Sequence, residues 1–247
     1  MARPRALDLF CGAGGAAMGL YRAGFDVVGI DIKPQPRYPF PFILGDALNP
    51  PVRLEDFDLV WASPPCQAST PMSNRWRGKG GKADSRIDLI HQTRMMLSER
   101  ASHWILENVI GAKMIAPFML RGEMFGLGTS RPRLFETTFI VMLPQARKRL
   151  GATAIYGKAD GRRLQTRKDG TELRAWTLDE GRAAMDMPWG DENDIREAIP
   201  PVYSAWIGAY AMLALGHEPT AWERTSHSLP MRHLQPGGEA LPSGGLP

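Results

Sequence analysis

The sequence predicts an α/β protein built on a doubly wound, mostly parallel sheet. Five short apolar runs alternate with helix-like or loop segments through the first half of the chain, as in sheets whose parallel strands are joined by crossover helices. Three runs end in an acid: Asp31, Asp46 and Glu107. Ligands bind outside the carboxyl ends of such strands, so these acids indicate a binding site there. The runs are Ala6–Phe10, Asp26–Ile30, Phe42–Leu44, Asp58–Ala62 and Trp104–Leu106.

Composition limits the class of protein. A chain of 247 residues with 43% hydrophobic and 23% charged residues fits one large globular domain with a small appendage. No apolar stretch reaches the length of a membrane span, and the first residues do not form a signal peptide. Cys11 and Cys66 are too few for a disulfide framework, so we expect a cytoplasmic protein (host cytoplasm if phage-encoded). The net charge of +4 favours a polyanionic partner.

The first strand runs into a glycine-rich turn, Phe10–Ala17, followed by a helix of small residues that Gly24 ends. Gly12 and Gly14 fit the dinucleotide pattern G-x-G-x-x-G/A, with Asp31 at the next strand end. This arrangement indicates a nucleoside-containing ligand whose ribose meets Asp31, and it leaves a nicotinamide oxidoreductase open as an alternative. Asp46 either binds the base of the same ligand or caps a helix.

The fourth run ends on Pro64, Pro65 and Cys66. Prolines stiffen the chain, so this strand end presents the thiol on a rigid support that suits a nucleophile, although a turn closing a strand is the alternative. The basic, glycine-rich segment Gln67–Asp84 follows directly. We interpret it as a mobile lid over a phosphate-bearing substrate, with a surface loop as the alternative.

Glu107 closes an otherwise apolar run, so burial should raise its pKa and let it act as a proton donor, unless it pairs with an arginine. Ser85–Arg100 is predicted to be a helix. Arg131 and Arg133 precede a predicted strand over Thr137–Leu143. Two alternating arginines along a strand point to one face and form a fork for phosphate or a base edge, unless they mark an exposed edge strand.

The last third contains a basic segment and two helices. Thr177–Glu180 is a capping box that opens a short helix through Met187. A closing helix begins after Pro200-Pro201 and ends at Gly216. Asp160-Gly161 and Asp169-Gly170 are hairpin-turn signals. The basic residues of this region are Arg147, Lys148, Arg149, Lys158, Arg162, Arg163, Arg167, Lys168 and Arg174.

In this order, the motifs resemble those of the DNA (cytosine-5) methyltransferase family, as in its small phage or orphan members. The five matches span roughly residues 5 to 215, and together they are far more specific than any one alone. They are Asp8-Leu-Phe-Cys-Gly-Ala-Gly-Gly15, Pro65-Cys66-Gln67, Glu107-Asn108-Val109, Arg131-x-Arg133 and the closing motif Ala198 to Gly208.

The resemblance implies a methyltransferase fold and an S-adenosylmethionine-dependent reaction on a cytosine flipped out of double-stranded DNA. Cys66 would add to C6, Glu107 would protonate N3, and Arg131 and Arg133 would hold the base and backbone. The implied cofactor-binding residues are Phe10, Gly12, Gly14, Gly15, Asp31, Ile32, Asp46, Pro65 and Ala198. The implied DNA-binding residues are Gln67, Ser69, Arg75, Arg77, Lys79 and Asn108.

The resemblance also implies a division of the chain: residues 1–143 catalytic, 144–196 a small target-recognition region, 197–216 the closing helix, and 217–247 a flexible tail. The recognition region is short, which predicts a short or relaxed target site. We expect a monomer without a metal, of the restriction–modification type. Two supporting positions depart from the family pattern, where Thr129 replaces glutamine and Glu197 replaces asparagine.

Other functions explain fewer residues. A nicotinamide oxidoreductase leaves Cys66, Glu107 and the basic hairpin unused. An amino-methyltransferase needs an aromatic residue where Cys66 stands. A catalytically silent DNA-binding relic is disfavoured because the nucleophile, the acid and the cofactor loop are all present, whereas RNA as the substrate stays open.

Overall fold

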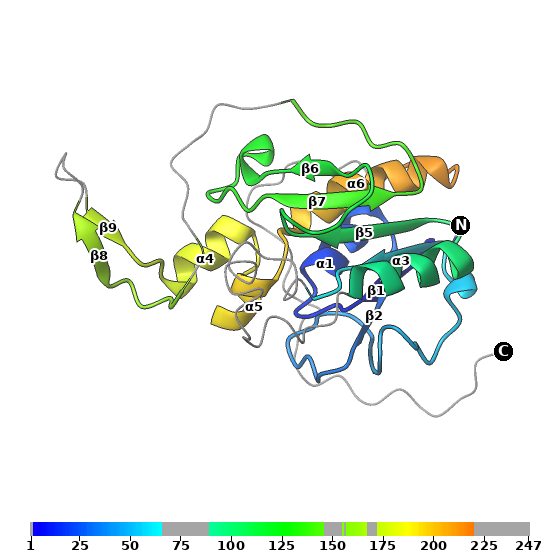
Figure 1. Cartoon of the computed structure of the whole chain (residues 1–247), viewed down its shortest axis with the longest axis horizontal. Coiled ribbons are helices and arrows are strands. Elements are labelled where there is room, and N and C mark those ends of the chain that lie inside the picture. Colours follow the sequence, from blue (N-terminus) through cyan, green and yellow to red (C-terminus); the bar gives the residue numbers. More distant parts are fainter. Residues whose placement is uncertain (1, 66–88, 146–154, 156, 167–171, 220–247) are drawn as a thin grey trace.

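A seven-stranded sheet forms the centre of the computed structural model, which describes residues 2–65, 89–145, 155, 157–166 and 172–219 (Figure 1). Its strands lie in the order β3-β2-β1-β4-β5-β7-β6. The first five are parallel to their neighbours, while β7 and β6 are antiparallel, so the predicted fold class is confirmed. The strands are β1 Arg5–Leu9, β2 Asp26–Asp31, β3 Phe42–Leu44, β4 Leu59–Ala62, β5 Trp104–Asn108, β6 Phe118–Leu120 and β7 Arg133–Thr137.

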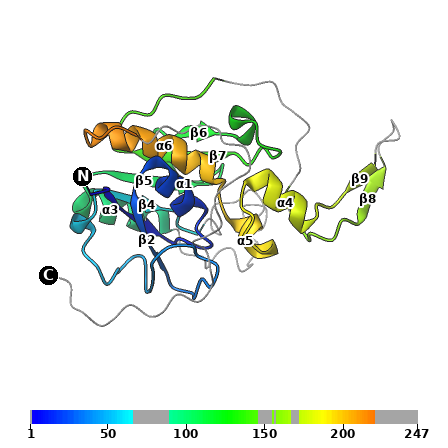
Figure 2. The ribbon, with the colours of Figure 1, turned by 180° about the vertical axis from the view of Figure 1, so that it is seen from behind.

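Helices cover both faces of the sheet (Figures 1 and 2). Helices α1 (Gly15–Ala23) and α6 (Pro201–Ala214) contribute to the hydrophobic core on one face, and α3 (Leu89–Arg100) and the 3-10 turn η1 (Leu54–Asp56) contribute to the core on the other. Successive strand residues point to opposite faces. Accordingly, Ala6 belongs to the first core and Leu7 to the second. This two-sided burial explains why the strands are almost continuously apolar.

Helices α1 and α6 pack unusually closely because Gly19 lies between them. A side-chain carbon at Gly19 would lie 2.0 Å from the Pro201 carbonyl oxygen and 2.0 Å from the Ser204 hydroxyl. Any larger residue would therefore force the helices apart. The predicted closing helix is present as α6, but it begins at the second proline, Pro201, and ends at Ala214, two residues before Gly216.

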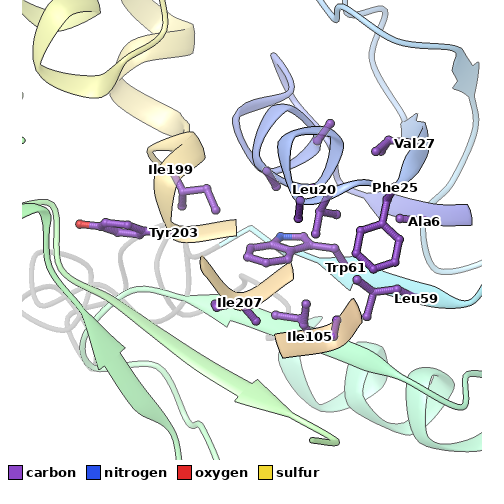
Figure 3. Close-up of a cluster of buried hydrophobic side chains, with 14 of the residues drawn as sticks. Ala6, Leu20, Phe25, Val27, Leu59, Trp61, Ile105, Ile199, Tyr203 and Ile207 are labelled. Atoms are coloured by element: carbon purple, nitrogen blue, oxygen red, sulfur yellow. The ribbon is translucent and has the colours of Figure 1, made fainter. Parts of the chain in front are cut away.

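Trp61 of β4 is the largest fully buried side chain and joins the sheet to these helices. Figure 3 shows its indole among Leu20 of α1, Ile207 of α6 and Ile105 of β5. Its Nε1 donates a hydrogen bond to the Ser63 hydroxyl at 2.9 Å, so the buried ring also fixes the first residue after β4.

A smaller unit follows the sheet. Strands β8 (Arg163–Thr166) and β9 (Glu172–Arg174) pair as an antiparallel hairpin that projects away from the sheet, beyond helices α4 (Leu178–Met185) and α5 (Glu192–Glu197) (Figure 1). Thr177 caps α4 in the predicted capping box. Asp160-Gly161 is not a turn between two strands. Asp160 instead forms a bridge with Thr177 at the base of the hairpin.

One predicted strand is wrong. The strand lies at Arg133–Thr137 rather than at Thr137–Leu143. The last pairing with β5 is Ile105 with Thr137, and beyond it the apolar residues have no partner strand. Ile140 is accordingly 87% exposed. Strand β6 and helix α5 were not predicted.

Several predicted features lie outside the described residues. They include Cys66, the basic segment Gln67–Asp84, the turn Asp169-Gly170 and most of the tail from residue 217. The first turn of the helix predicted over Ser85–Arg100 also lies there, and the described part is α3. Within the described ranges, no helix is both long and apolar enough to cross a membrane.

Candidate active site at the carboxyl edge of the sheet

Four neighbouring parallel strands bring most of the predicted site residues to one edge. Phe10 follows β1, Asp31 closes β2, Pro65 lies just past β4, and Glu107 lies near the end of β5. These strands are adjacent in the order β2-β1-β4-β5, so their carboxyl ends lie side by side. The parallel sheet thus joins the candidate cofactor residues and the candidate catalytic acid in one site.

The glycine loop after β1 is held by main-chain hydrogen bonds. The Cys11 amide donates to the Ile30 carbonyl at 3.1 Å, and the Gly14 amide donates to the Cys11 carbonyl at 3.0 Å. The loop takes positive φ at Phe10 (58°), Gly12 (48°) and Gly14 (83°). Positive φ is costly for a residue with a side chain, so Phe10 is strained and the two glycines relieve the turn.

The three loop glycines serve different purposes. A side-chain carbon at Gly12 would have none of the described residues within 4 Å, so this backbone is open toward that part of the chain. By contrast, a carbon at Gly14 would meet the Pro39 ring at 2.8 Å, and one at Gly15 would meet the Ile199 carbonyl at 2.3 Å. Gly14 and Gly15 are therefore required by packing within the protein, and Gly12 is the position at which a ligand can approach the backbone.

The two acids beside this loop organise their own strand ends. The Asp31 carboxylate accepts hydrogen bonds from the amides of Gly12 and Lys33, both at 3.0 Å. Asp46 is exposed and accepts from the Leu48 amide at 2.9 Å, so it forms a turn instead of capping a helix. Ile32 is 69% exposed despite its apolar side chain. An acid, an exposed isoleucine and an open glycine together suit a nucleoside.

Helix α1 begins directly behind the loop and offers its N-terminus to a ligand. Gly14 is its N-cap, with no side-chain cap and no acidic residue in the first turn. The positive end of the helix dipole is thus free for a carboxylate or a phosphate.

Asp8 lies buried within this part of the sheet, and neither carboxyl oxygen has a hydrogen-bond partner. Burial raises the pKa of the Asp8 carboxyl well above its ordinary value; the Ala17 amide lowers it in part, and Asp31 and Glu107 raise it further. Burial, together with the charges of Asp8 and Asp31, also raises the pKa of the Cys11 thiol. A thiol with a raised pKa does not act as a nucleophile, so Cys11 is structural.

The residues before Cys66 are rigidly held. The Ser63 amide donates to the Leu9 carbonyl at 3.2 Å, and the Asn108 side-chain amide donates to the Pro64 carbonyl at 3.0 Å. The Asn108 carbonyl oxygen in turn accepts from the Val109 amide at 2.9 Å. Both ends of the Asn108 side chain are therefore bonded within the protein. Asn108 thus supports the residue two positions before Cys66, and its contact with DNA stays a prediction.

Glu107 is a buried acid with an unused oxygen. It is 6% exposed, and its Oε1 forms an ion pair with the Nε of Arg133 at 3.0 Å but accepts no hydrogen bond from the residues that the structure describes. Burial raises the pKa of the Glu107 carboxyl, and Arg133, the Ser63 hydroxyl and Arg131 lower it only in part. The predicted burial and raised pKa are confirmed. The predicted alternative, an arginine partner, is present as well.

The two arginines do not alternate along one strand. Strand β7 begins at Arg133, while Arg131 precedes it with φ of 35°. The Arg131 guanidinium donates to the carbonyls of Arg196 and Ala198, the latter at 2.7 Å from the terminal nitrogen and 3.1 Å from Nε. Its predicted place on a shared strand face is therefore wrong. Arg131 ties this turn to the segment between α5 and α6.

Residues missed by sequence reasoning support this arrangement. Ser63 links Trp61 to Glu107. The Tyr203 hydroxyl of α6 donates to the carbonyls of Ser130 and Arg131, at 3.2 Å and 2.9 Å, and so holds the strained turn. The Ser-Pro-Pro sequence gives a local signal for Ser63. No local sequence pattern predicts the hydrogen bond between Tyr203 and Arg131.

The remaining predicted positions divide into two groups. Ala198 lies against the glycine loop, with its Cβ 3.4 Å from the carbon that Gly15 lacks. Gln67, Ser69, Arg75, Arg77 and Lys79 lie outside the described residues, as does Cys66. Among the residues that the structure describes, no group of three or more His, Cys, Asp or Glu side chains is placed to hold a metal ion.

Comparison with solved structures shows which proteins share this fold. The chain is similar to a proposed DNA modification methyltransferase encoded within a prophage of E. coli (TM-score 0.58, 16% identity, 85% of this chain and 99% of that one). It is also similar to methyltransferase EhMeth of Entamoeba histolytica (0.58, 11%, 87% and 99%) and to Dnmt2 methyltransferase of S. pombe (0.56, 15%, 86% and 99%). The chain thus shares the fold of these three methyltransferases.

Comparison of sequences then shows a match to a family over part of the chain. Residues 5–114 match the family described as C-5 cytosine-specific DNA methylase. The Type II methyltransferase M.XorII of Xanthomonas oryzae pv. oryzae is 33% identical over 129 residues, which is 45% of this chain and 29% of that protein. The match thus spans less than a third of that relative's length. Residues 5–114 are therefore similar to the C-5 cytosine-specific DNA methylase family, in agreement with the resemblance that the motifs indicate.

Proposed function

We propose that this chain is a DNA (cytosine-5) methyltransferase that uses S-adenosylmethionine and acts as a monomer on double-stranded DNA in the cytoplasm. One observation supports the chemistry above all. A buried acid with a raised pKa, Glu107, lies on the strand beside the one that leads into Cys66, and its Oε1 is paired with Arg133 but accepts no hydrogen bond among the described residues.

The reaction requires a covalent step because C5 of cytosine is a poor nucleophile. The Cys66 thiolate forms a bond to C6, and the electron pair displaced toward C5 makes that carbon nucleophilic. S-adenosylmethionine, when bound, supplies the methyl group that C5 takes. A base then removes the proton from C5, and the Sγ–C6 bond breaks to release 5-methylcytosine and the thiolate.

Glu107 would hold a proton at N3 of the cytosine. Its raised pKa keeps the carboxyl protonated to higher pH than an exposed glutamate, and Oε1 has no hydrogen-bond partner that a base would displace. A positioned acid of this kind contributes about 10²- to 10⁴-fold to a rate. Arg133, half-buried beside Glu107, is the arginine we assign to the carbonyl oxygen of the base. Arg131 instead positions the turn that leads to it.

The cofactor would occupy the carboxyl ends of β1, β2 and β3. The open backbone at Gly12 and the uncapped N-terminus of α1 suit the methionine part, which carries a carboxylate. Phe10 would stack on the adenine and Asp31 would bind the ribose. The further cofactor contacts that we propose are Gly14, Gly15, Ile32, Asp46, Pro65 and Ala198.

We place DNA binding on residues 144–196 and on the segment after Cys66, whose proposed contacts are Gln67, Ser69, Arg75, Arg77 and Lys79. The positive charge of residues 144–196 is concentrated in and around the hairpin, with nine Lys and Arg against three Asp and Glu over residues 145–174. Such a surface binds phosphates and reads few bases, so the target site would be short or relaxed. Bisulfite sequencing of plasmid methylated by the protein tests this, and a long site would contradict it.

The deciding experiment uses tritiated S-adenosylmethionine with DNA, RNA and DNA containing 5-fluorocytosine. Label should enter DNA at C5, and the fluorinated DNA should form a covalent complex, because fluorine at C5 blocks the release step. Cys66→Ser should abolish that complex. The matched control is Cys11→Ala, which removes the other cysteine and should keep it. Label in RNA alone would overturn the substrate assignment, and an adduct that survives Cys66→Ser would overturn the nucleophile.

A further inference from the structure

The unit formed by α4 and α5 packs directly on the glycine loop. The Trp189 Nε1, between the two helices, donates a hydrogen bond of 2.8 Å to the carbonyl oxygen of Ala13. Ala13 is itself a buried member of the hydrophobic cluster of this unit, beside Met185, Met187 and Ile195. A residue of the cofactor loop is thus part of the core of a segment more than 170 residues away in sequence.

The Trp189 bond determines the orientation of one peptide group. The Ala13–Gly14 peptide has its amide bonded to the Cys11 carbonyl and its carbonyl bonded to Trp189. Gly12 and Gly14 flank it with φ of 48° and 83°, and glycine populates either sign of φ with little preference. The local sequence therefore does not dictate this turn. Among the described residues, the side chain that donates a hydrogen bond to the Ala13 carbonyl is Trp189, and this bond orients the Ala13–Gly14 peptide.

The same unit carries the base of the basic hairpin. The Gly161 amide donates to the Trp176 carbonyl at 3.2 Å, and the Ala175 amide donates to the Arg162 carbonyl at 2.8 Å. Trp176 lies in the cluster that contains Ala13. An ion pair between Arg22 of α1 and Asp186, at 2.6 Å, docks the segment just before Trp189 on the helix that follows the loop. One packed cluster thus joins the hairpin to the loop.

We propose that Trp189 is a positioning residue that holds the glycine loop in its ligand-binding conformation, and that it couples cofactor binding to DNA binding at the hairpin. The inference rests on the proposed function, which supplies the cofactor and the DNA. Loss of one hydrogen bond of this kind weakens binding by about three- to tenfold when the loop must then be ordered by the ligand. By thermodynamic linkage, bound cofactor changes the affinity for DNA by the same factor by which bound DNA changes the affinity for the cofactor.

Trp189→Phe tests this by removing the N–H donor while keeping an aromatic ring in place. The matched control is Trp206→Phe, because Trp206 makes an equivalent bond, 2.9 Å from its Nε1 to the Met142 carbonyl, away from the loop. The affinity for S-adenosylhomocysteine, which cannot react, is measured by calorimetry with and without a short DNA duplex. Thermal melting shows whether each variant folds.

We expect Trp189→Phe to bind S-adenosylhomocysteine about three- to tenfold more weakly than wild type, with the effect of DNA on that affinity reduced toward one. Trp206→Phe should match wild type both in its affinity for S-adenosylhomocysteine and in the effect of DNA on that affinity. Equal behaviour of the two variants would overturn the inference while leaving the proposed function intact. A wild-type protein that binds no S-adenosylhomocysteine would overturn both. If Trp189→Phe folds poorly, Asp186→Asn at the exposed neighbouring position must weaken binding in the same direction, or the inference fails.

Discussion

The two halves of the sheet's carboxyl edge present different chemical groups, main-chain groups in one half and buried side chains in the other. The cofactor half, at β1 and β2, is shaped by main-chain groups: a loop held by amide–carbonyl bonds, an open glycine and a bare helix N-terminus. The catalytic half, at β4, β5 and β7, is shaped by buried side chains, with Glu107 beside Arg133 and Ser63. Each half suits its ligand, because main-chain donors bind without titrating, whereas proton transfer requires a group whose pKa is shifted.

This difference predicts opposite sensitivities. Substitution in the catalytic half should change rate and pH dependence while cofactor affinity stays the same. Change in the cofactor half should alter affinity while leaving the pH profile alone. The following four predictions test the contrast, from the largest expected effect to the smallest.

Glu107→Gln should lower the rate of methyl transfer by about 10²- to 10⁴-fold, because the amide cannot deliver a proton. The wild-type rate should fall as pH rises through the raised pKa of Glu107, since the proton is then lost, and this limb should vanish in the variant. Single-turnover rates across pH measure both. Affinity for S-adenosylhomocysteine should not change, and a parallel loss of affinity would break the contrast between the halves.

Arg94→Met should cost about 3 to 5 kcal/mol of the free energy of unfolding. Arg94 of α3 forms a bidentate salt bridge with Glu136 of β7, in which Nε lies 2.8 Å from Oε2 and Nη2 lies 2.7 Å from Oε1. Both side chains are mostly buried. The Ile115 amide also donates to Glu136, so this carboxylate fixes the loop that follows the Glu107 strand.

Urea unfolding measures this loss. Removing one partner leaves a buried charge, whereas the double variant Arg94→Met with Glu136→Met removes both and should recover part of the stability. An additive double variant would show that the pair does not couple.

Asp8→Asn should raise the melting temperature at pH 8 and have less effect at pH 5. The folded-state pKa of Asp8 is raised, so the stability present below its ordinary pKa is lost as pH rises through the raised value. An asparagine never carries that charge. Thermal melts of both proteins across pH provide the test, and a loss of stability that is equal at all pH values would contradict it.

Arg37→Gln should lower the free energy of unfolding by less than about 1 kcal/mol. Arg37 pairs with Asp191 and with Asp194, the latter at 2.6 Å, but its side chain is 41% exposed and solvent screens the charges. This pair lies at the periphery of the cofactor half, so cofactor affinity should change little. Melts at low and high salt measure the effect, and a loss comparable to that of Arg94→Met would show that this docking contact matters more than its exposure implies.

Many of the strand and helix positions could be predicted because they depend on local sequence patterns. Parallel strands leave continuous apolar runs, and the boundaries predicted for β1 to β5 agree with the structure to within two residues. The capping box at Thr177 and the proline start of α6 are local as well. The two errors, the misplaced strand and the position of Arg131, both arise because the outcome depends on contacts with distant parts of the chain. The run after Thr137 is apolar but has no partner strand, and Arg131 bonds to carbonyls 65 and 67 residues later in the chain.

By itself, then, the sequence determined the fold class, the acids at the ends of three strands and the burial of Glu107, since backbone restrictions and side-chain periodicity act over a few residues. Only the tertiary structure decided which loop glycine is open, which arginine faces the acid, and that Trp189 holds Ala13. These outcomes depend on where distant segments return to the sheet. Contacts across more than 60 residues leave no local signal, because many partners would satisfy the same donor or acceptor equally well.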